Sequence, residues 1–181
     1  PQPLRPGRDR AYDFFLPDAA AVPEWTDYLT GIRKEGDALV IGAGVAGMLI
    51  STQLAGAGVE HTVLEKNDEV GGSWYENRYP GAGVDTPSYL YSISSFDHPW
   101  STHFGKRDEV QGYLQAFADR HAVRDRVRFG TEVLSAAYDA ETQRWTVHVR
   151  NREGHQDTLT ARILIRAVGL LNRPKLPELP G

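Results

Sequence analysis

Six residues in the first third of the chain, Gly42–Gly47, constrain the fold more than any other segment. They read Gly-Ala-Gly-Val-Ala-Gly, and they follow the uninterrupted apolar run Ala38–Ile41, which is typical of a strand covered on both faces. A helix is expected over Val45–Ala57, where Gly58 can end it. A second strand, His61–Glu65, follows. The order of strand, glycine-rich turn, helix and strand predicts a βαβ unit with a parallel sheet.

Each glycine of this turn has its own physical reason. Gly42 permits a tight turn, Gly44 lets a pyrophosphate approach the backbone, and Gly47 allows the helix to pack closely on the strand. Glu65 follows Gly42 by 23 residues, at the end of the second strand, where a carboxylate can accept hydrogen bonds from ribose hydroxyls. A tightly packed turn beside a surface Glu65 is the alternative. The βαβ context favours a dinucleotide site, and these residues do not distinguish NAD from FAD.

The stretch from Gly71 to about Gly105 keeps neither a strand period nor a helix period. An irregular stretch of this length in a compact domain is usually functional. Gly71 and Gly72 form a second small-residue turn, which can approach a cofactor backbone. Eight aromatic residues lie between Trp74 and Phe104. Each alone is expected to fasten the loop to the core, whereas the set predicts the wall of a site for a flat ring.

The rest of the chain predicts one more helix and a meander. Asp108 can cap a helix whose apolar face carries Val110, Tyr113, Leu114 and Phe117. Alternating segments are expected to form an antiparallel meander, followed by a last buried strand; the meander segments are Val127–Val133, Trp145–Val149 and Thr158–Thr160, and the last strand is Ile163–Ile165 with Ala167 and Val168.

Composition excludes several classes of function. A net charge of −4 argues against a nucleic-acid binder, and no apolar run approaches the ~18 residues of a membrane span. The chain has no Cys, which excludes disulfides, iron–sulfur clusters and thiolate zinc sites and fits a cytoplasmic protein. Its six His residues show no metal spacing, so no metal site is expected. The first residue is Pro1 and the only Met is Met48, so we expect a piece of a longer polypeptide.

In the two glycine turns and the segments around them, the chain resembles the Baeyer–Villiger monooxygenases, a family of class B flavoprotein monooxygenases. The resemblance spans roughly residues 37–181, and these segments carry it in order and spacing: Gly42–Gly47, Leu64-Glu65, Val70–Tyr75, Asn77–Gly81, Asp85 and Tyr91. The stretch Gly71–Gly81 is far more specific than the glycine turn. It separates this family from the related N-hydroxylating and flavin-containing monooxygenases.

The resemblance implies an α/β fold, a glutathione-reductase-like FAD-binding Rossmann domain in which an antiparallel β-meander accompanies the parallel sheet. This FAD-binding domain would occupy residues 37–181, after a lead-in over residues 1–36 that carries a short helix. The implied cofactor-binding residues are Gly42, Gly44 and Gly47 at the pyrophosphate, Glu65 at the adenosine ribose, Gly72, Ser73, Trp74 and Tyr91 nearer the flavin, and the Val133 backbone at the adenine. Asp85 would lie near the isoalloxazine, where the family uses an Asp to help position an Arg. From the residues alone, Asp85 before Thr86-Pro87 indicates a turn.

The activity that the resemblance implies is an NADPH- and oxygen-dependent conversion of ketones to esters or lactones. The expected partners are a ketone, molecular oxygen and the remainder of the parent polypeptide. NADPH would bind outside this chain, because Gly81-Ala82-Gly83 lacks the third glycine of a second turn, and the 181 residues alone are expected to be inactive. A catalytically silent nucleotide-binding or interaction module is the alternative. Two departures stand out: Arg166 in an apolar strand, and Val168 where Thr is common among flavoproteins.

Overall fold

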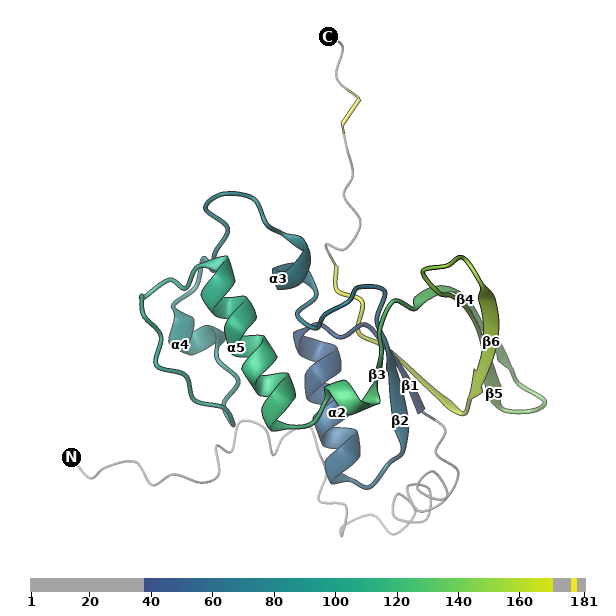
Figure 1. Ribbon diagram of the computed structural model, residues 1–181. Helices are drawn as coiled ribbons and strands as arrows, with labels where there is room; N and C mark the ends of the chain where they lie inside the picture. The colour runs from purple at the N-terminus through teal and green to yellow at the C-terminus, as the bar shows by residue number, and fades with distance from the viewer. Residues whose placement is uncertain (1–37, 171–176, 179–181) are drawn as a thin grey trace.

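The computed structural model describes residues 38–170 and 177–178, so the expected lead-in over residues 1–36 lies outside the described residues. Twelve elements are present in this part of the chain (Figure 1). They are β1 (Ala38–Ile41), α2 (Val45–Gly56), β2 (His61–Leu64), α3 (Ser73–Glu76), α4 (Ser88–Tyr91), α5 (Arg107–Arg120), η1 (Arg124–Arg126, a 3-10 turn), β3 (Val127–Arg128), β4 (Glu132–Asp139), β5 (Arg144–Arg150), β6 (Gln156–Ala161) and β7 (Ile163–Arg166).

The expected βαβ unit is confirmed. Strands β1 and β2 pair in parallel, with Ala38 opposite His61 and Ile41 opposite Leu64, and α2 connects them. The parallel sheet has the order β3-β2-β1-β7, and β4, β5 and β6 form a separate antiparallel sheet. A glutathione-reductase-like arrangement of parallel sheet and meander is therefore confirmed.

Three layers bury two main hydrophobic clusters, one on each face of the parallel sheet (Figure 1), and a small third cluster holds Ala38 and Val59. Val40 and Val63 face α2 and α5, where Met48 and Phe117 are fully buried. The side chains of alternate strand residues point to the opposite face, where they pack against the buried valines of β5. The sheet is thus covered on both faces, which explains why its central strand β1 is wholly apolar.

Two details of the predicted elements are wrong. Val127–Val133 does not belong to the meander as one strand: Val127 and Arg128 form β3, which pairs with β2 in parallel, and the meander starts at Glu132. The backbone turns between them because Gly130 has a positive φ of 59°. Asp108 is the second residue of α5 rather than its cap, and Lys106 occupies the cap position without a side-chain hydrogen bond.

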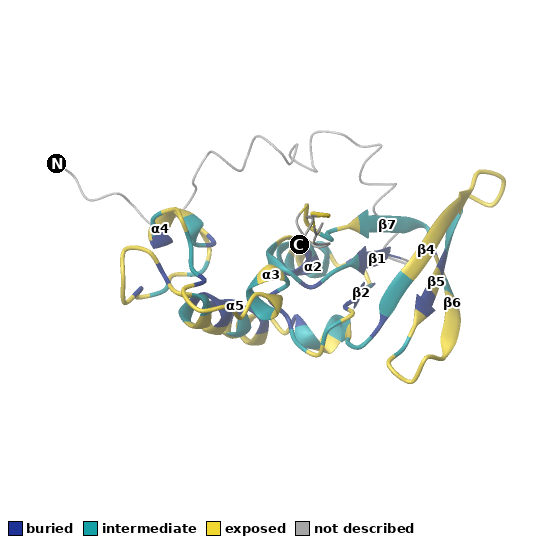
Figure 2. Cartoon of the chain, turned by 90° about the horizontal axis from the view of Figure 1, so that it is seen from above, coloured by how far each residue is buried: buried dark blue, intermediate teal, exposed yellow. Residues whose placement is uncertain are grey.

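The β4–β5 hairpin extends away from the parallel sheet, and its tip is exposed (Figure 2). The Asp139 carboxylate holds the tip, because it accepts hydrogen bonds from the Glu141 N–H at 2.9 Å and the Thr142 hydroxyl at 2.8 Å. These hydrogen bonds lower the pKa of Asp139.

Candidate cofactor site

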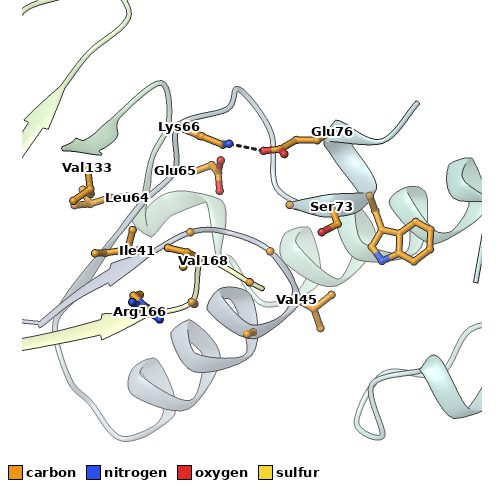
Figure 3. Close-up of a pocket in the computed structure, with 18 of the residues that line it drawn as sticks. Ile41, Val45, Leu64, Glu65, Lys66, Ser73, Glu76, Val133, Arg166 and Val168 are labelled. Atoms are coloured by element: carbon orange, nitrogen blue, oxygen red, sulfur yellow. Dashed lines mark ion pairs between the residues drawn. The ribbon is translucent and has the colours of Figure 1, made fainter. Parts of the chain in front are cut away.

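A cavity of about 760 Å³ lies at the carboxyl ends of β1, β2 and β7, a volume within the usual range for small-molecule sites. Such crevices are where open α/β sheets bind ligands. Eight of the ten expected site residues line it (Figure 3): Gly42, Gly44, Glu65, Gly72, Ser73, Trp74, Tyr91 and Val133. The other two, Gly47 and Asp85, are not among the lining residues.

The glycine turn is held between the ends of two strands. The Gly42 N–H donates to the Leu64 carbonyl at 2.8 Å, and its φ of 99° is a conformation that glycine adopts without strain. A Cβ on Gly47 would lie 1.8 Å from the Gly42 carbonyl oxygen. Gly47 therefore serves the packing of α2 against the turn, as its place in the pattern predicts.

Helix α2 presents an uncapped N-terminus to the cavity. Gly44 is its N-cap and offers no side chain, and the first turn carries no acidic residue. Gly44, Val45 and Ala46 line the cavity. The first N–H groups of a helix have no partner within it, so this end combines free donors with the positive end of the helix dipole. An anion is the ligand that fits here.

Glu65 is buried beside this turn. One carboxylate oxygen accepts the Ala43 N–H at 2.7 Å and the other accepts the Asn67 N–H at 2.9 Å. The side chain thereby ties the glycine turn to the end of β2, and it still lines the cavity. Each carboxylate oxygen has a second lone pair, so acceptance from ribose hydroxyls remains open to it.

The second glycine turn packs directly on the first. The Gly71 N–H donates to the Ala43 carbonyl at 3.0 Å, and a Cβ on Gly72, whose φ is 54°, would lie 3.0 Å from the Gly44 Cα. A side chain on Gly72 would crowd this approach, whereas a Cβ on Gly44 would make an ordinary contact. The cavity floor is therefore bare backbone, which leaves room for a diphosphate-sized group.

Two of the eight aromatic residues between Trp74 and Phe104 line the cavity. The Trp74 indole N–H donates to the Tyr91 hydroxyl at 2.7 Å, and the rings meet edge to face with centroids 5.6 Å apart. Phe96 and Trp100 instead pack in the core against Tyr113. The prediction that the whole set walls a ring site is wrong, because most of the set fastens the loop to α5 or is exposed.

The loop that carries the aromatics is fixed from several sides. The Arg107 guanidinium donates to the Trp74 carbonyl at 2.6 Å, and the buried Ser88 hydroxyl accepts the Gly105 N–H at 2.7 Å. The His98 ring packs against Trp100 and Tyr113, with ring centroids 4.6 and 5.2 Å away.

Five lining residues with polar side chains were not expected from the sequence: Lys66, Glu76, Thr131, Glu132 and Arg166. Lys66 directly follows the expected site residue Glu65, and Glu132 directly precedes Val133. Their position next to expected site residues was the sequence signal that could have identified them. Arg166 ends the last parallel strand, and the rule that ligands bind beyond the carboxyl ends of parallel strands would have found it. Asp85 is exposed, and its catalytic role stays a prediction.

Two family descriptions match the chain. Residues 40–117 match an NAD(P)-binding Rossmann-like domain, and residues 90–180, half of the chain, match the L-lysine 6-monooxygenase/L-ornithine 5-monooxygenase family. No helix in the described part of the chain is long and apolar enough to cross a membrane.

Known monooxygenases are similar to most of the chain. A Baeyer–Villiger monooxygenase of Streptomyces coelicolor is 38% identical over 144 residues, which is 78% of this chain and 27% of the relative. The phenazine N-monooxygenase of Lysobacter antibioticus is 37% identical over 80% of the chain and 27% of its own length. The structure of OTEMO in complex with FAD and NADP superimposes with a TM-score of 0.74 at 36% identity, over 80% of this chain and 27% of that one. The chain therefore spans about a quarter of the length of these proteins.

Proposed function

Because the chain belongs to the Baeyer–Villiger type of flavin-dependent monooxygenases, we propose that its cavity binds FAD and that it is the FAD-binding part of a longer enzyme. That enzyme would use NADPH and oxygen to convert a ketone to an ester or lactone. NADPH would bind to sequence outside these residues. The cytoplasm is the compartment we propose, from the absence of Cys.

One observation carries the proposal: the uncapped N-terminus of α2, the buried carboxylate of Glu65 and the bare contact between Gly44 and Gly72 meet at a single cavity. Donor N–H groups suit a diphosphate, a carboxylate suits a ribose, and bare backbone leaves room for both.

Each end of the cavity would hold one half of the cofactor. Gly42 and Gly44 would face the diphosphate, Glu65 the ribose and Val133 the adenine. The flavin half would lie toward the second glycine turn, whose lining residues are Gly72, Ser73, Trp74 and Tyr91. When bound, FAD would supply the redox chemistry, and these residues would bind and orient it. Asp85 would act through an Arg of the longer enzyme, as a positioning residue.

Oxygenation of a nitrogen atom is the second candidate. The match over residues 90–180 is to an amine-hydroxylating family, and the Lysobacter relative is named as an N-monooxygenase. The Gly71–Gly81 stretch favours the ketone reaction. Supplying the longer enzyme with NADPH and either a cyclic ketone or an aromatic nitrogen heterocycle separates the two, because the first reaction yields a lactone and the second an N-oxide, which mass spectrometry distinguishes.

Gly44→Ala tests the cofactor site without disturbing the fold. Gly44 has an ordinary φ of −74°, and a Cβ there would lie 3.6 Å from the Gly72 Cα, a normal contact. We expect unchanged thermal unfolding of the free protein and FAD affinity weakened by about tenfold, because the added methyl occupies the floor where the diphosphate would lie. Titration of flavin fluorescence measures the affinity. Equal FAD binding by both proteins would contradict the assignment of this turn.

A chain that takes up no FAD at all would favour the catalytically silent module instead. Visible absorbance of the purified protein, before and after incubation with FAD, distinguishes these two outcomes. The measurement needs no substrate, so it tests the cofactor site apart from the reaction.

A further inference from the structure

Arg166 is the one charged residue of strand β7, and it lies at the end of that strand. It pairs in register with Ile41, the last residue of β1, and both line the cavity (Figure 3). Strand residues alternate between faces, so Arg166 shares a face with Leu164, which packs against the meander cluster. Arg166 itself is exposed. The charged side chain therefore lies in solvent next to the part of the sheet that the meander covers, and it is not buried in the core.

Five charged side chains line the cavity, and four of them have partners. Glu65 accepts two backbone N–H groups. Lys66 and Glu76 form an ion pair at 3.0 Å, and Glu132 accepts from a β5 arginine at 2.7 Å. The Arg166 side chain has no hydrogen bond or ion pair with any other described residue. Within the described part of the chain, its guanidinium is thus a positive lining charge that a ligand can meet, in addition to the acceptor oxygens of Glu65.

The surroundings of Arg166 indicate which part of a ligand it meets. Ile41 and Leu64 carry apolar side chains on the same face of the sheet, and Val133 lines the cavity beside them (Figure 3). An apolar wall suits a flat aromatic ring. The diphosphate, in contrast, has the N–H groups of α2 as donors.

We propose that the Arg166 guanidinium lies against the adenine ring of bound FAD and closes the adenine end of the cavity. The inference rests on the proposed function, since it needs FAD in this cavity. A guanidinium is planar and weakly hydrated, so it stacks on aromatic faces, whereas a lysine ammonium is compact and strongly hydrated. Arg166 would therefore raise the affinity for the adenylate half of the cofactor.

The test compares Arg166→Met and Arg166→Lys in the full chain. FAD is titrated into each protein, and the quenching of flavin fluorescence gives the Kd. We expect Arg166→Met to weaken binding by about 3- to 30-fold. Arg166→Lys is expected to lose most of the same factor, because it keeps the charge but not the plane of the guanidinium.

Arg128→Met is the matched control. Arg128 also ends a strand of the parallel sheet and is exposed, but it does not line the cavity. The Arg128→Met protein should bind FAD with the same affinity as the unmodified protein. Thermal unfolding without FAD checks that each variant is folded, and Arg166→Gln replaces Arg166→Met if the Met variant unfolds at a lower temperature.

The outcomes separate this inference from the proposed function. If the unmodified chain binds no FAD, the proposed function fails and this inference fails with it. If the unmodified chain binds FAD and Arg166→Met binds it within a factor of two, only the role of Arg166 is overturned. Arg166→Lys binding as well as the unmodified protein would show that charge alone suffices, which overturns the stacking contact.

Discussion

Gly47 tolerates no side chain in this structure. A Cβ would lie 1.8 Å from the Gly42 carbonyl oxygen, and that oxygen belongs to backbone that is itself fixed between strands. We expect Gly47→Ala to lower the free energy of unfolding by about 1–3 kcal/mol, because α2 must move away from the turn. Urea unfolding followed by circular dichroism measures the change.

Gly112→Ala is the matched control for that substitution. Gly112 lies in the interior of α5, is exposed, and a Cβ there would meet nothing within 4 Å. Alanine has the better helix propensity, so this variant is expected to gain about 0.5–1 kcal/mol. A Gly47→Ala protein as stable as Gly112→Ala would show that the turn is not packed as described.

Glu65 shows how one residue can serve both the fold and the site. The sequence predicted a carboxylate at the cavity, and it lies there. Its hydrogen bonds to the Ala43 and Asn67 N–H groups could not be predicted, because they depend on how two turns meet in space. The same limit applies to Arg166, because only the structure shows that the end of β7 is exposed and lines the cavity.

At the scale of elements, Arg124 joins three segments of the chain. It pairs with Glu69 before the second glycine turn and donates to Asp119 of α5 at 2.6 Å. Burial raises the pKa of Glu69, but hydrogen bonds from Arg124, the Val70 N–H and Gln115 outweigh it, and the net effect lowers the pKa below 4.5. These contacts fix the segment before the second glycine turn, which forms the cavity floor, against α5.

The lowered pKa of Glu69 makes part of the stability depend on pH. A carboxylate that binds its proton less readily in the folded state stabilises the fold above its unfolded pKa, and the contribution is lost as the pH falls below 4.5. We expect Glu69→Gln to destabilise the protein by about 1–3 kcal/mol at pH 7. The difference from the unmodified protein should narrow as the pH falls from 5 toward 3, roughly the range that protonates such a group.

Urea unfolding at several pH values checks this prediction. Glu153→Gln is the control, since Glu153 is an exposed carboxylate on the β5–β6 turn. It should follow the unmodified protein at every pH. If the free energies of unfolding of Glu69→Gln and the unmodified protein differ by the same amount at every pH, then the Glu69 carboxylate does not titrate in this range.

Local sequence patterns predicted the elements whose apolar residues or flanking turns mark them clearly in the sequence. Strand β1 and the buried face of α5 are confirmed, because the strand is a continuous apolar run and the helix carries an apolar stripe. Strand β2 and helix α2 are also confirmed, and their place after the glycine turn in the βαβ order predicted them. Strand β3 has only two residues, so its pairing with β2 depends on tertiary contacts. Most of β4 is exposed, so it lacks the alternation that marks a strand with one buried face.

At the scale of the whole molecule, ligand binding should raise the stability of the fold. FAD that binds only the folded state contributes about 2.7 kcal/mol at a concentration 100 times its Kd. For a chain of this size that corresponds to a rise in Tm of about 5–10 °C. Differential scanning calorimetry with and without FAD measures it.

The Gly44→Ala protein is the control for this measurement at the same FAD concentration. Its weaker binding should give a smaller rise in Tm. If FAD does not raise the Tm of the unmodified protein, the proposal that FAD binds in the cavity is contradicted.

The cavity combines residues from six separate parts of the sequence, between Ile41 and Leu170. The sequence predicted the glycine turns and Glu65 because their spacing has a local physical reason. It could not predict that Asp85 lies outside the cavity wall, because the path of an irregular loop follows from contacts such as those of Ser88 and Arg107.

The β4–β5 hairpin offers a practical route to labelling. Its tip lies seven residues along the strand from Glu132, which is about 23 Å, so the cavity is remote from it. The chain has no Cys, so Glu141→Cys would introduce a unique thiol at a turn that Asp139 already organises through its neighbours' hydrogen bonds. A dye or an electrode surface could be attached there at a single defined point while the cavity stays open.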